Sequence, residues 1–288
     1  MSRIIRWLPS LRIHSWGGFG SQLYVAYLII RIQQKFPKRR IKVIIHTSGV
    51  TARSQEFDFS PLNVSVVTVD DFSRKQETTT LQRNTKVKRV FWLYFKEVSK
   101  FFLEYSRLQV SANDESSFLR IWMGTLTTRG HYTGLKRNES ALESLYALLS
   151  SNVQVNSSNL IWGVTSIHFR LGDLLSLEGK HPVSASRVED LISKYGLSKT
   201  PLYIFSDSER IHFESHSENS ECWKAAEYNR LPPIDTLLRC VNSENFIGTT
   251  AKLSLWIAIF RSTLFNRVSF LPNELRWSIE EDENIHWF

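Results

Sequence analysis

The order of predicted elements is the feature that most constrains the fold. Residues 12–15 are typical of a short strand, and after a glycine-rich turn apolar side chains recur at helical spacing over 23–30. Pro37 bounds this helix, because proline disfavours helix in the residue before it, and the apolar residues 41–45 favour a second strand. Strand, turn, helix and strand in this order open a parallel α/β unit.

The second half of the chain repeats the alternation of strands and helices. Each predicted strand there ends in small, polar or charged residues. In open parallel sheets ligands bind at the carboxyl ends of the strands, so we expect these three loops to face one crevice. The predicted strands are 160–169, 201–205 and 245–247. The predicted helices are 188–195, 235–240 and 253–260.

A polar segment divides the 288 residues into two predicted domains. Residues 150–159 contain four serines and three asparagines, as in a linker, and the charge changes sign there. Residues 1–155 hold 23 Lys and Arg against 11 Asp and Glu, whereas residues 156–288 hold 13 against 17. We therefore predict domains at 1–155 and 156–288. The basic half favours an anionic partner such as lipid headgroups, phosphates or nucleic acid, with a merely solvated basic surface as the alternative.

Cysteine usage and hydropathy indicate the compartment. Cys222 and Cys240 make neither a metal-ligand spacing nor a disulfide framework, which favours a reducing environment. We find no signal-peptide pattern and no run of about 18 apolar residues. We expect a cytoplasmic protein, with a peripheral position on the inner face of the cytoplasmic membrane as an extension of that expectation.

The segment 91–108 has two interpretations. Its aromatic and aliphatic residues recur every three or four positions, which predicts an amphipathic helix after a polar loop at 72–88. The favoured interpretation is a helix that faces the core. Lys96 and Lys100 keep a membrane-binding helix as the alternative.

The predicted strand that ends near residue 169 carries the sharpest chemical pattern. Alternation along a strand sends His168 and Arg170 to the same side, and Gly172 permits a tight turn from which Asp173 can hold the guanidinium. A fixed guanidinium suits a diphosphate and can stabilise charge on a departing phosphate without a metal ion. The alternative is an ordinary Arg–Asp pair that closes a turn.

Two small-residue turns precede predicted helices. The turn 248–252 includes Thr250 and Lys252, and the backbone N–H groups at a helix start attract phosphate, although a simple threonine cap is the alternative. The turn 17–20 lacks the spacing of a dinucleotide fingerprint and favours either a close approach to a ligand or a tight turn. No D-x-D metal motif ends a predicted strand, and Asp70-Asp71 favours a solvated loop.

Taken together and in order, these segments resemble the bacterial alpha-1,2-fucosyltransferases, and more distantly the protein O-fucosyltransferases and alpha-1,6-fucosyltransferases. The family's G-G-x-G-N-Q turn corresponds to Gly17-Gly18-Phe19-Gly20-Ser21-Gln22, and its H-x-R-R-x-D motif to residues 168–173. Its F-S-D loop corresponds to Phe205-Ser206-Asp207. Its late segment corresponds to residues 235–256, and the resemblance is stronger from residue 160 onward.

The resemblance implies a GT-B fold, with two facing Rossmann-like α/β domains and mostly parallel sheets. It implies an inverting, metal-independent transfer of fucose from GDP-fucose to a hydroxyl of an oligosaccharide, surface polysaccharide or lipid-linked glycan, with no further cofactor. The first domain would serve the acceptor and the second the donor. Arg170 would bind the diphosphate and His168 would line the same pocket. The donor-binding residues implied are Asp173, Ser206, Asp207, Thr250, Lys252, Ser254, Gly18, Gly20, Ser21 and Gln22.

The chain departs from the family pattern at three places. Ser21 replaces an asparagine, Leu171 replaces the second arginine of the H-x-R-R-x-D motif, and Ala251-Lys252-Leu253 stands where the family often has Ser-Ser-Phe or Ser-Thr-Phe. We hypothesise that Lys252 supplies the charge that Leu171 removes. The base is open, because His168 is the nearest candidate by chemistry but the phosphate itself could take the proton.

Two other function classes compete with a transferase. A glycan-binding protein without turnover would fit the changes at Ser21 and Leu171. A nucleic-acid-binding module could use the basic half, with Phe91, Trp92 and Tyr94 stacking on bases. No recognised nucleic-acid motif is present and the strand-end loops would then be unexplained, so we expect no nucleic-acid partner.

Overall fold

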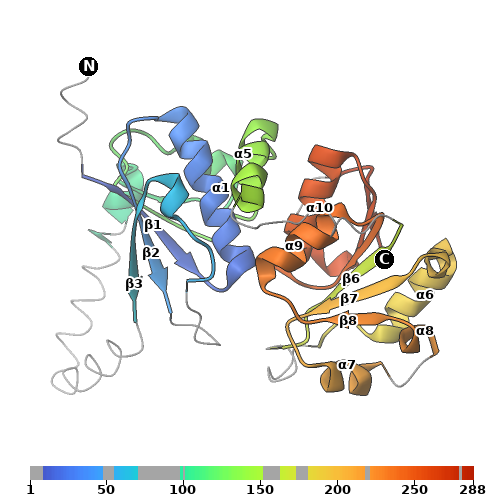
Figure 1. The fold of residues 1–288 in the computed structure, drawn as a ribbon. Helices are drawn as coiled ribbons and strands as arrows, with labels where there is room; N and C mark the ends of the chain where they lie inside the picture. The colour runs from blue at the N-terminus through green and yellow to red at the C-terminus, as the bar shows by residue number, and fades with distance from the viewer. Residues whose placement is uncertain are drawn as a thin grey trace. The chain divides into compact units, whose positions relative to one another are not determined.

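The chain forms two compact units, residues 1–137 and 138–288, each built around one parallel sheet (Figure 1). The predicted α/β class with parallel sheets in two parts is therefore confirmed. The computed structural model describes residues 9–47, 55–70, 98–99, 101–151, 163–172, 181–217, 221–278 and 281–288.

The first unit has a five-stranded sheet in the order β3-β2-β1-β5-β4, with every pairing parallel. The chain moves from β1 outward to β3, then returns to place β5 on the other side of β1. The sheet thus reverses its strand order between β1 and β5. The elements are β1 (Leu11–Trp16), α1 (Phe19–Lys35), β2 (Ile41–His46), β3 (Ser65–Val69), β4 (Gln109–Ser111), α4 (Glu115–Leu119) and β5 (Thr127–Arg129).

Helix α1 supplies much of this unit's core. Leu23, Leu28 and Ile29 are fully buried, and the helix ends at Lys35, two residues before Pro37. On β1 the consecutive residues from Ile13 to Ser15 are all buried, as expected for a strand inside a parallel sheet, whereas on β2 buried residues alternate with half-buried ones.

The second unit has a six-stranded sheet in the order β11-β10-β9-β6-β7-β8, again parallel throughout. Here β6 is central, and the order reverses between β6 and β9. The elements are α5 (Glu139–Ser151), β6 (Thr165–Phe169), α6 (Ala185–Tyr195), β7 (Leu202–Ser206), α7 (Arg210–His216), α8 (Glu221–Lys224), β8 (Glu227–Asn229), α9 (Pro233–Asn242), β9 (Asn245–Gly248), α10 (Lys252–Phe265), β10 (Ser269–Leu271) and β11 (Ile285–Trp287).

Helix α5 belongs to the second unit, so the division falls before this helix rather than at residue 155. The Tyr146 ring lies 5.4 Å from the Phe260 ring and 5.2 Å from the Phe265 ring, both on α10. Asn242 of α9 donates a hydrogen bond to the Tyr146 hydroxyl at 3.4 Å. Burial of the apolar face of α5 against α9 and α10 explains the earlier division, while residues 152–162 of the predicted linker lie outside the described residues.

The expectation of a core-facing helix over 91–108 is wrong for its described end. Residues 98–99 and 101–105 are helical, but Phe101, Phe102 and Tyr105 are exposed to solvent. The remainder of that segment lies outside the described residues, as does the predicted loop at 72–88. Within the residues that the structure describes, no helix combines the length and hydrophobicity needed to cross a bilayer.

The guanidinium of Arg261 joins several elements of the second unit. It is fully buried on α10, and its Nη1 donates to the carbonyl oxygens of Cys240, Val241 and Ser243 at 2.6–3.1 Å. Its Nη2 donates to the carbonyls of Glu244 and Val268 at 2.7 and 2.8 Å. Burial lowers the pKa of Arg261 to about 9. The side chain therefore donates hydrogen bonds to the backbone carbonyls at the C-terminal end of α9 and just before β9. Strand β9 in turn leads to the turn that precedes α10.

Replacing this side chain should destabilise the protein strongly. We expect Arg261→Met to lower the free energy of unfolding by about 3 kcal/mol or more, because several buried carbonyls lose their donors. Chemical denaturation followed by circular dichroism measures the change. Arg276→Met, at an exposed arginine, is the control and should change stability little. Equal stability of the two variants would contradict the role of Arg261.

Candidate functional site

The candidate site lies at the carboxyl ends of β6 and β9, where the order of the second sheet reverses. In open parallel sheets the loops at such a point run to opposite sides, and ligands commonly bind there. Strand β6 ends at Phe169 and is followed by Arg170, whereas β9 ends at Gly248 and leads to the start of α10. The topology therefore brings two of the predicted loops together.

A threonine hydroxyl ties these two loops to each other. The Thr249 Oγ1 accepts a hydrogen bond from the backbone N–H of Arg170 at 3.0 Å and donates to the carbonyl of His168 at 3.0 Å. Thr249 is only 1% exposed. Its role is to fix the backbone that carries Arg170, and its hydroxyl has no hydrogen left for a ligand.

Asp207, from the loop after β7, holds the same turn from the other side. Its Oδ1 accepts hydrogen bonds from the backbone N–H groups of Leu171 and Gly172, both at 2.9 Å. A Cβ at Gly172 would lie 2.8 Å from the Asp207 Oδ2, so a larger residue would displace this carboxylate from its present position. Leu171 points into the hydrophobic core and is fully buried. Asp207 thus organises the loop, and the residue that replaces the family's second arginine packs in the core.

His168 is a buried neutral imidazole. It is 5% exposed, and its Nδ1 lies 2.8 Å from the Ser254 Oγ, where the proton position depends on the tautomer. Burial lowers the pKa of His168 to about 4, an effect that nearby Arg170 reinforces and Asp207 opposes. Because its imidazole is held within the sheet and resists protonation, His168 is poorly suited to act as the general base. It anchors the first turn of α10 through Ser254.

Two cations and a helix start meet at this edge. Arg170 and Lys252 are both half-buried. The pKa of Lys252 is lowered, first by burial and second by the charge of Arg170. No side chain caps the N-terminus of α10 at Ala251. Two neighbouring cations together with a helix N-terminus form a positively charged environment that suits a phosphate group.

The other predicted site residues of the second unit differ in their surroundings. Ser206 is buried, and its Oγ accepts a hydrogen bond from the backbone N–H of Ser208 at 3.2 Å. Thr250 is half-buried between Thr249 and α10. Asp173 lies outside the described residues. In the described parts of the chain no group of three His, Cys, Asp or Glu side chains gathers to hold a metal ion.

The glycine-rich turn belongs to the first unit, and the Gln22 side chain within it bonds to backbone groups of the same unit. The Gln22 side chain is fully buried, accepts hydrogen bonds from the N–H groups of Glu56 and Phe57 at 2.9 Å, and donates to the Gly17 carbonyl at 3.2 Å. The Glu56 carboxylate accepts from the Phe19 N–H at 2.6 Å. The Glu56 carboxylate therefore accepts a hydrogen bond from a backbone N–H at the start of α1, next to Gly18 and Gly20. The Gln22 side chain links the turn to the backbone of residues 56 and 57.

Sequence reasoning missed a histidine pair at the carboxyl edge of the first sheet. The His14 Nδ1 lies 2.7 Å from the His46 Nε2, and the Trp16 ring stacks on His46 with 4.4 Å between centroids and 8° between planes. The Tyr132 hydroxyl donates to the His14 carbonyl at 2.8 Å. Strand alternation places residues 14 and 16 on one face, but the pairing of β1 with β2 was needed to bring in His46.

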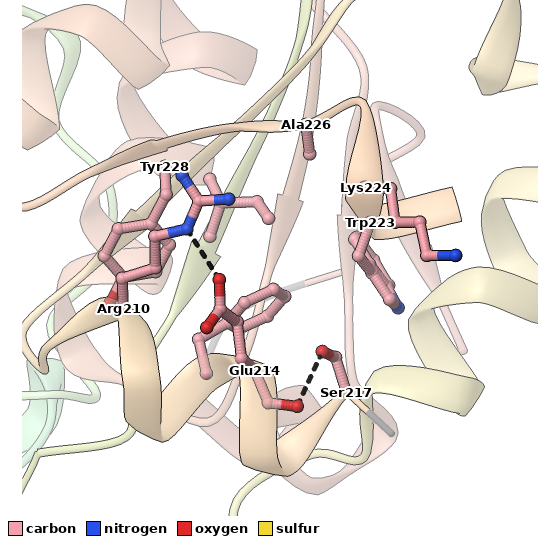
Figure 2. Close-up of a pocket in the computed structure, with 9 residues that line it drawn as sticks. Arg210, Glu214, Ser217, Trp223, Lys224, Ala226 and Tyr228 are labelled. Carbon is pink, nitrogen blue, oxygen red and sulfur yellow. Dashed lines mark hydrogen bonds and ion pairs between the residues drawn. The ribbon is translucent and has the colours of Figure 1, made fainter. Parts of the chain in front are cut away.

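Sequence reasoning also missed a cavity of about 150 Å³ beside β7 and β8, shown in Figure 2. Residues of helices α7 and α8 form its polar wall, where the Arg210 Nε forms an ion pair with the Glu214 Oε1 at 2.8 Å. The indole N–H of Trp223 is buried and has no hydrogen-bond partner among the residues that the structure describes. None of the predicted site residues lines this cavity, so it is separate from the edge that carries Arg170. Its lining residues are Ile204, Arg210, Phe213, Glu214, Ser217, Trp223, Lys224, Ala226 and Tyr228.

Several solved structures follow a similar chain course. E. coli heptosyltransferase WaaC with ADP-2-deoxy-2-fluoro heptose matches 97% of this chain and 92% of its own, at 10% identity and a TM-score of 0.47. POFUT1 in complex with GDP matches 91% and 98%, at 14% identity and a TM-score of 0.43. E. coli ADP-heptose lps heptosyltransferase II matches 97% and 90%, at 10% identity and a TM-score of 0.42. We draw no function from similarity at this level.

No protein-family model matches the chain, and no curated protein matches it in sequence.

The buried imidazole predicts a specific pH dependence of stability. The pKa of His168 falls from 6.5 in the unfolded chain to about 4 in the fold, so between these values the unfolded chain binds more protons. This contribution to stability is complete above pH 6.5 and is lost as the pH falls towards 4, by up to about 3 kcal/mol. In thermal unfolding across this range, the melting temperature of His168→Gln should fall less with decreasing pH than that of the wild type. The exposed-site control His286→Gln should keep the wild-type slope, and equal slopes for all three proteins would contradict the prediction.

Proposed function

We propose that the second unit binds the diphosphate of a nucleotide sugar and that the protein is a glycosyltransferase of the GT-B type. The observation that carries this proposal is the pair of neighbouring cations, Arg170 and Lys252, at the N-terminus of α10 and at the reversal point of the sheet. Two neighbouring positive charges at a helix N-terminus attract an anion with two negative charges, such as a diphosphate.

The reaction needs charge stabilisation where the leaving group forms. An acceptor hydroxyl oxygen attacks the anomeric carbon of the sugar, the bond from that carbon to the diphosphate oxygen breaks, and the hydroxyl proton goes to a base. The electron pair of the broken bond stays on the diphosphate. The backbone of Arg170 and Leu171 is held by Thr249 and Asp207 before substrate arrives, and we propose that the Arg170 guanidinium stabilises this charge. We propose that these two cations take the place of a metal ion.

The proposal extends to the identity of the sugar donor. The arrangement of His168, Arg170, Ser206 and Asp207 follows the fucosyltransferase resemblance, which supports GDP-fucose as donor and an inverting transfer. Lys252 stands next to Arg170 and supplies a second charge where Leu171, buried in the core, supplies none. We propose a hydroxyl of an oligosaccharide, a surface polysaccharide or a lipid-linked glycan as acceptor, bound by the first unit.

A panel of nucleotides tests the donor class. We expect GDP to raise the apparent melting temperature of the full chain more than UDP, CDP or ADP do, because a ligand that binds only the folded state stabilises it. Arg170→Ala should weaken GDP binding about tenfold or more, since it removes a charge-assisted hydrogen bond. The control Arg276→Ala alters an exposed arginine elsewhere in the same unit and should bind GDP normally.

Turnover separates an enzyme from a binding protein. Transfer or hydrolysis of GDP-fucose by the wild type, lost in Arg170→Ala with the fold retained, supports the transferase. GDP binding without either reaction, over a range of glycan acceptors, would favour a glycan-binding protein. Absence of any nucleotide response would contradict the proposal as a whole.

A further inference from the structure

An aromatic cluster in the first unit is exposed to solvent. Phe101, Phe102 and Tyr105 are 65%, 64% and 80% exposed, and helical spacing places them within an arc of about 100°. The Phe101 ring lies 6.1 Å from Phe102 and 6.3 Å from Tyr105. The three rings therefore form one continuous apolar surface rather than scattered side chains, which distinguishes them from ordinary exposed hydrophobic residues.

A neighbouring segment extends this surface. Leu119 and Trp122 are 63% and 48% exposed. Their segment is held against the cluster by two hydrogen bonds: the Arg120 Nη2 donates to the Glu104 carbonyl at 3.4 Å, and the Trp122 Nε1 donates to the Arg107 carbonyl at 3.3 Å. The apolar patch, as we name it, thus consists of Phe101, Phe102, Tyr105, Leu119 and Trp122.

Basic residues lie among the patch residues. Arg107 and Arg120 belong to the two segments themselves, and the Lys35 Nζ donates to the carbonyls of Leu119 and Ile121 at 3.4 and 3.2 Å. Glu104 is the acidic residue within the helical segment. The whole first unit contains 23 Lys and Arg against 9 Asp and Glu, a net charge of +14. The patch therefore combines exposed aromatic rings with three adjacent basic residues, Lys35, Arg107 and Arg120, in a unit whose sequence carries a net positive charge.

We propose that the apolar patch docks on the surface of an anionic lipid bilayer. Aromatic rings partition into the headgroup region, and lysine and arginine attract anionic headgroups, so this combination is that of an interfacial membrane-binding surface. A second copy of the chain fits less well, because pairing of two patches would bring two units of charge +14 together. The proposal rests on the first unit alone and does not depend on the transferase assignment.

Vesicle sedimentation with the full chain tests this proposal. We expect the wild type to bind vesicles of phosphatidylcholine and phosphatidylglycerol, to bind pure phosphatidylcholine weakly, and to be released as salt rises. The double variant Phe102→Ser with Tyr105→Ser should lose about tenfold or more in partitioning, because two rings no longer enter the interface. These side chains are exposed, so the melting temperature should stay near that of the wild type.

A matched control uses apolar residues exposed elsewhere. Ile211 and Trp277 of the second unit are 63% and 77% exposed, and Ile211→Ser with Trp277→Ser should leave vesicle binding unchanged. Equal binding by the patch variant and the wild type would overturn the proposal, as would absence of binding to anionic vesicles at low salt. Gel filtration gives a further overturning result: a wild-type dimer that the patch substitutions convert to a monomer would assign the surface to a second copy.

Discussion

The hydrogen bonds that join the ends of β6 and β9 are the constraint on which the rest of the site depends. A parallel sheet that reverses its strand order must open into two diverging loops, and left alone these loops would carry unpaired backbone groups. Thr249 pairs the backbone of residues 168 and 170, and Asp207 pairs that of residues 171 and 172. The polar residues of the loops thus bind backbone groups, and the backbone position of Arg170 is fixed as a consequence.

The use of loop side chains to bond the backbone explains how far the sequence could predict the site. The strands that end at residues 169 and 248 were predictable because buried parallel strands are short apolar runs followed by polar turns. The motif pattern predicted Asp207 and Gln22 as ligand-binding residues, and in the structure the Asp207 Oδ1 and the Gln22 Oε1 accept hydrogen bonds from backbone N–H groups. A motif match alone does not separate a side chain that touches a ligand from one that shapes the loop.

The parts that the sequence did not predict depend on tertiary contacts. Strands β4, β5, β10 and β11 have three residues each, too few for a periodic pattern. Helix α5 joins the second unit through Tyr146, whose partners on α10 lie more than a hundred residues further along the chain. The His14–His46 contact needs the pairing of β1 with β2. The amphipathic pattern ending near residue 108 was visible, but periodicity alone cannot tell a face that packs on the core from a face that is exposed to solvent.

The central claim is that Arg170 and Lys252 act together on one diphosphate. A double-mutant cycle measured by calorimetric titration with GDP tests it most directly, with Arg170→Ala, Lys252→Ala and the double variant. The account predicts that each single variant weakens GDP binding and that the double variant loses less than the two single losses added together, since both cations contact the same ligand. Wild-type affinity in both single variants, with the proteins folded, would contradict it.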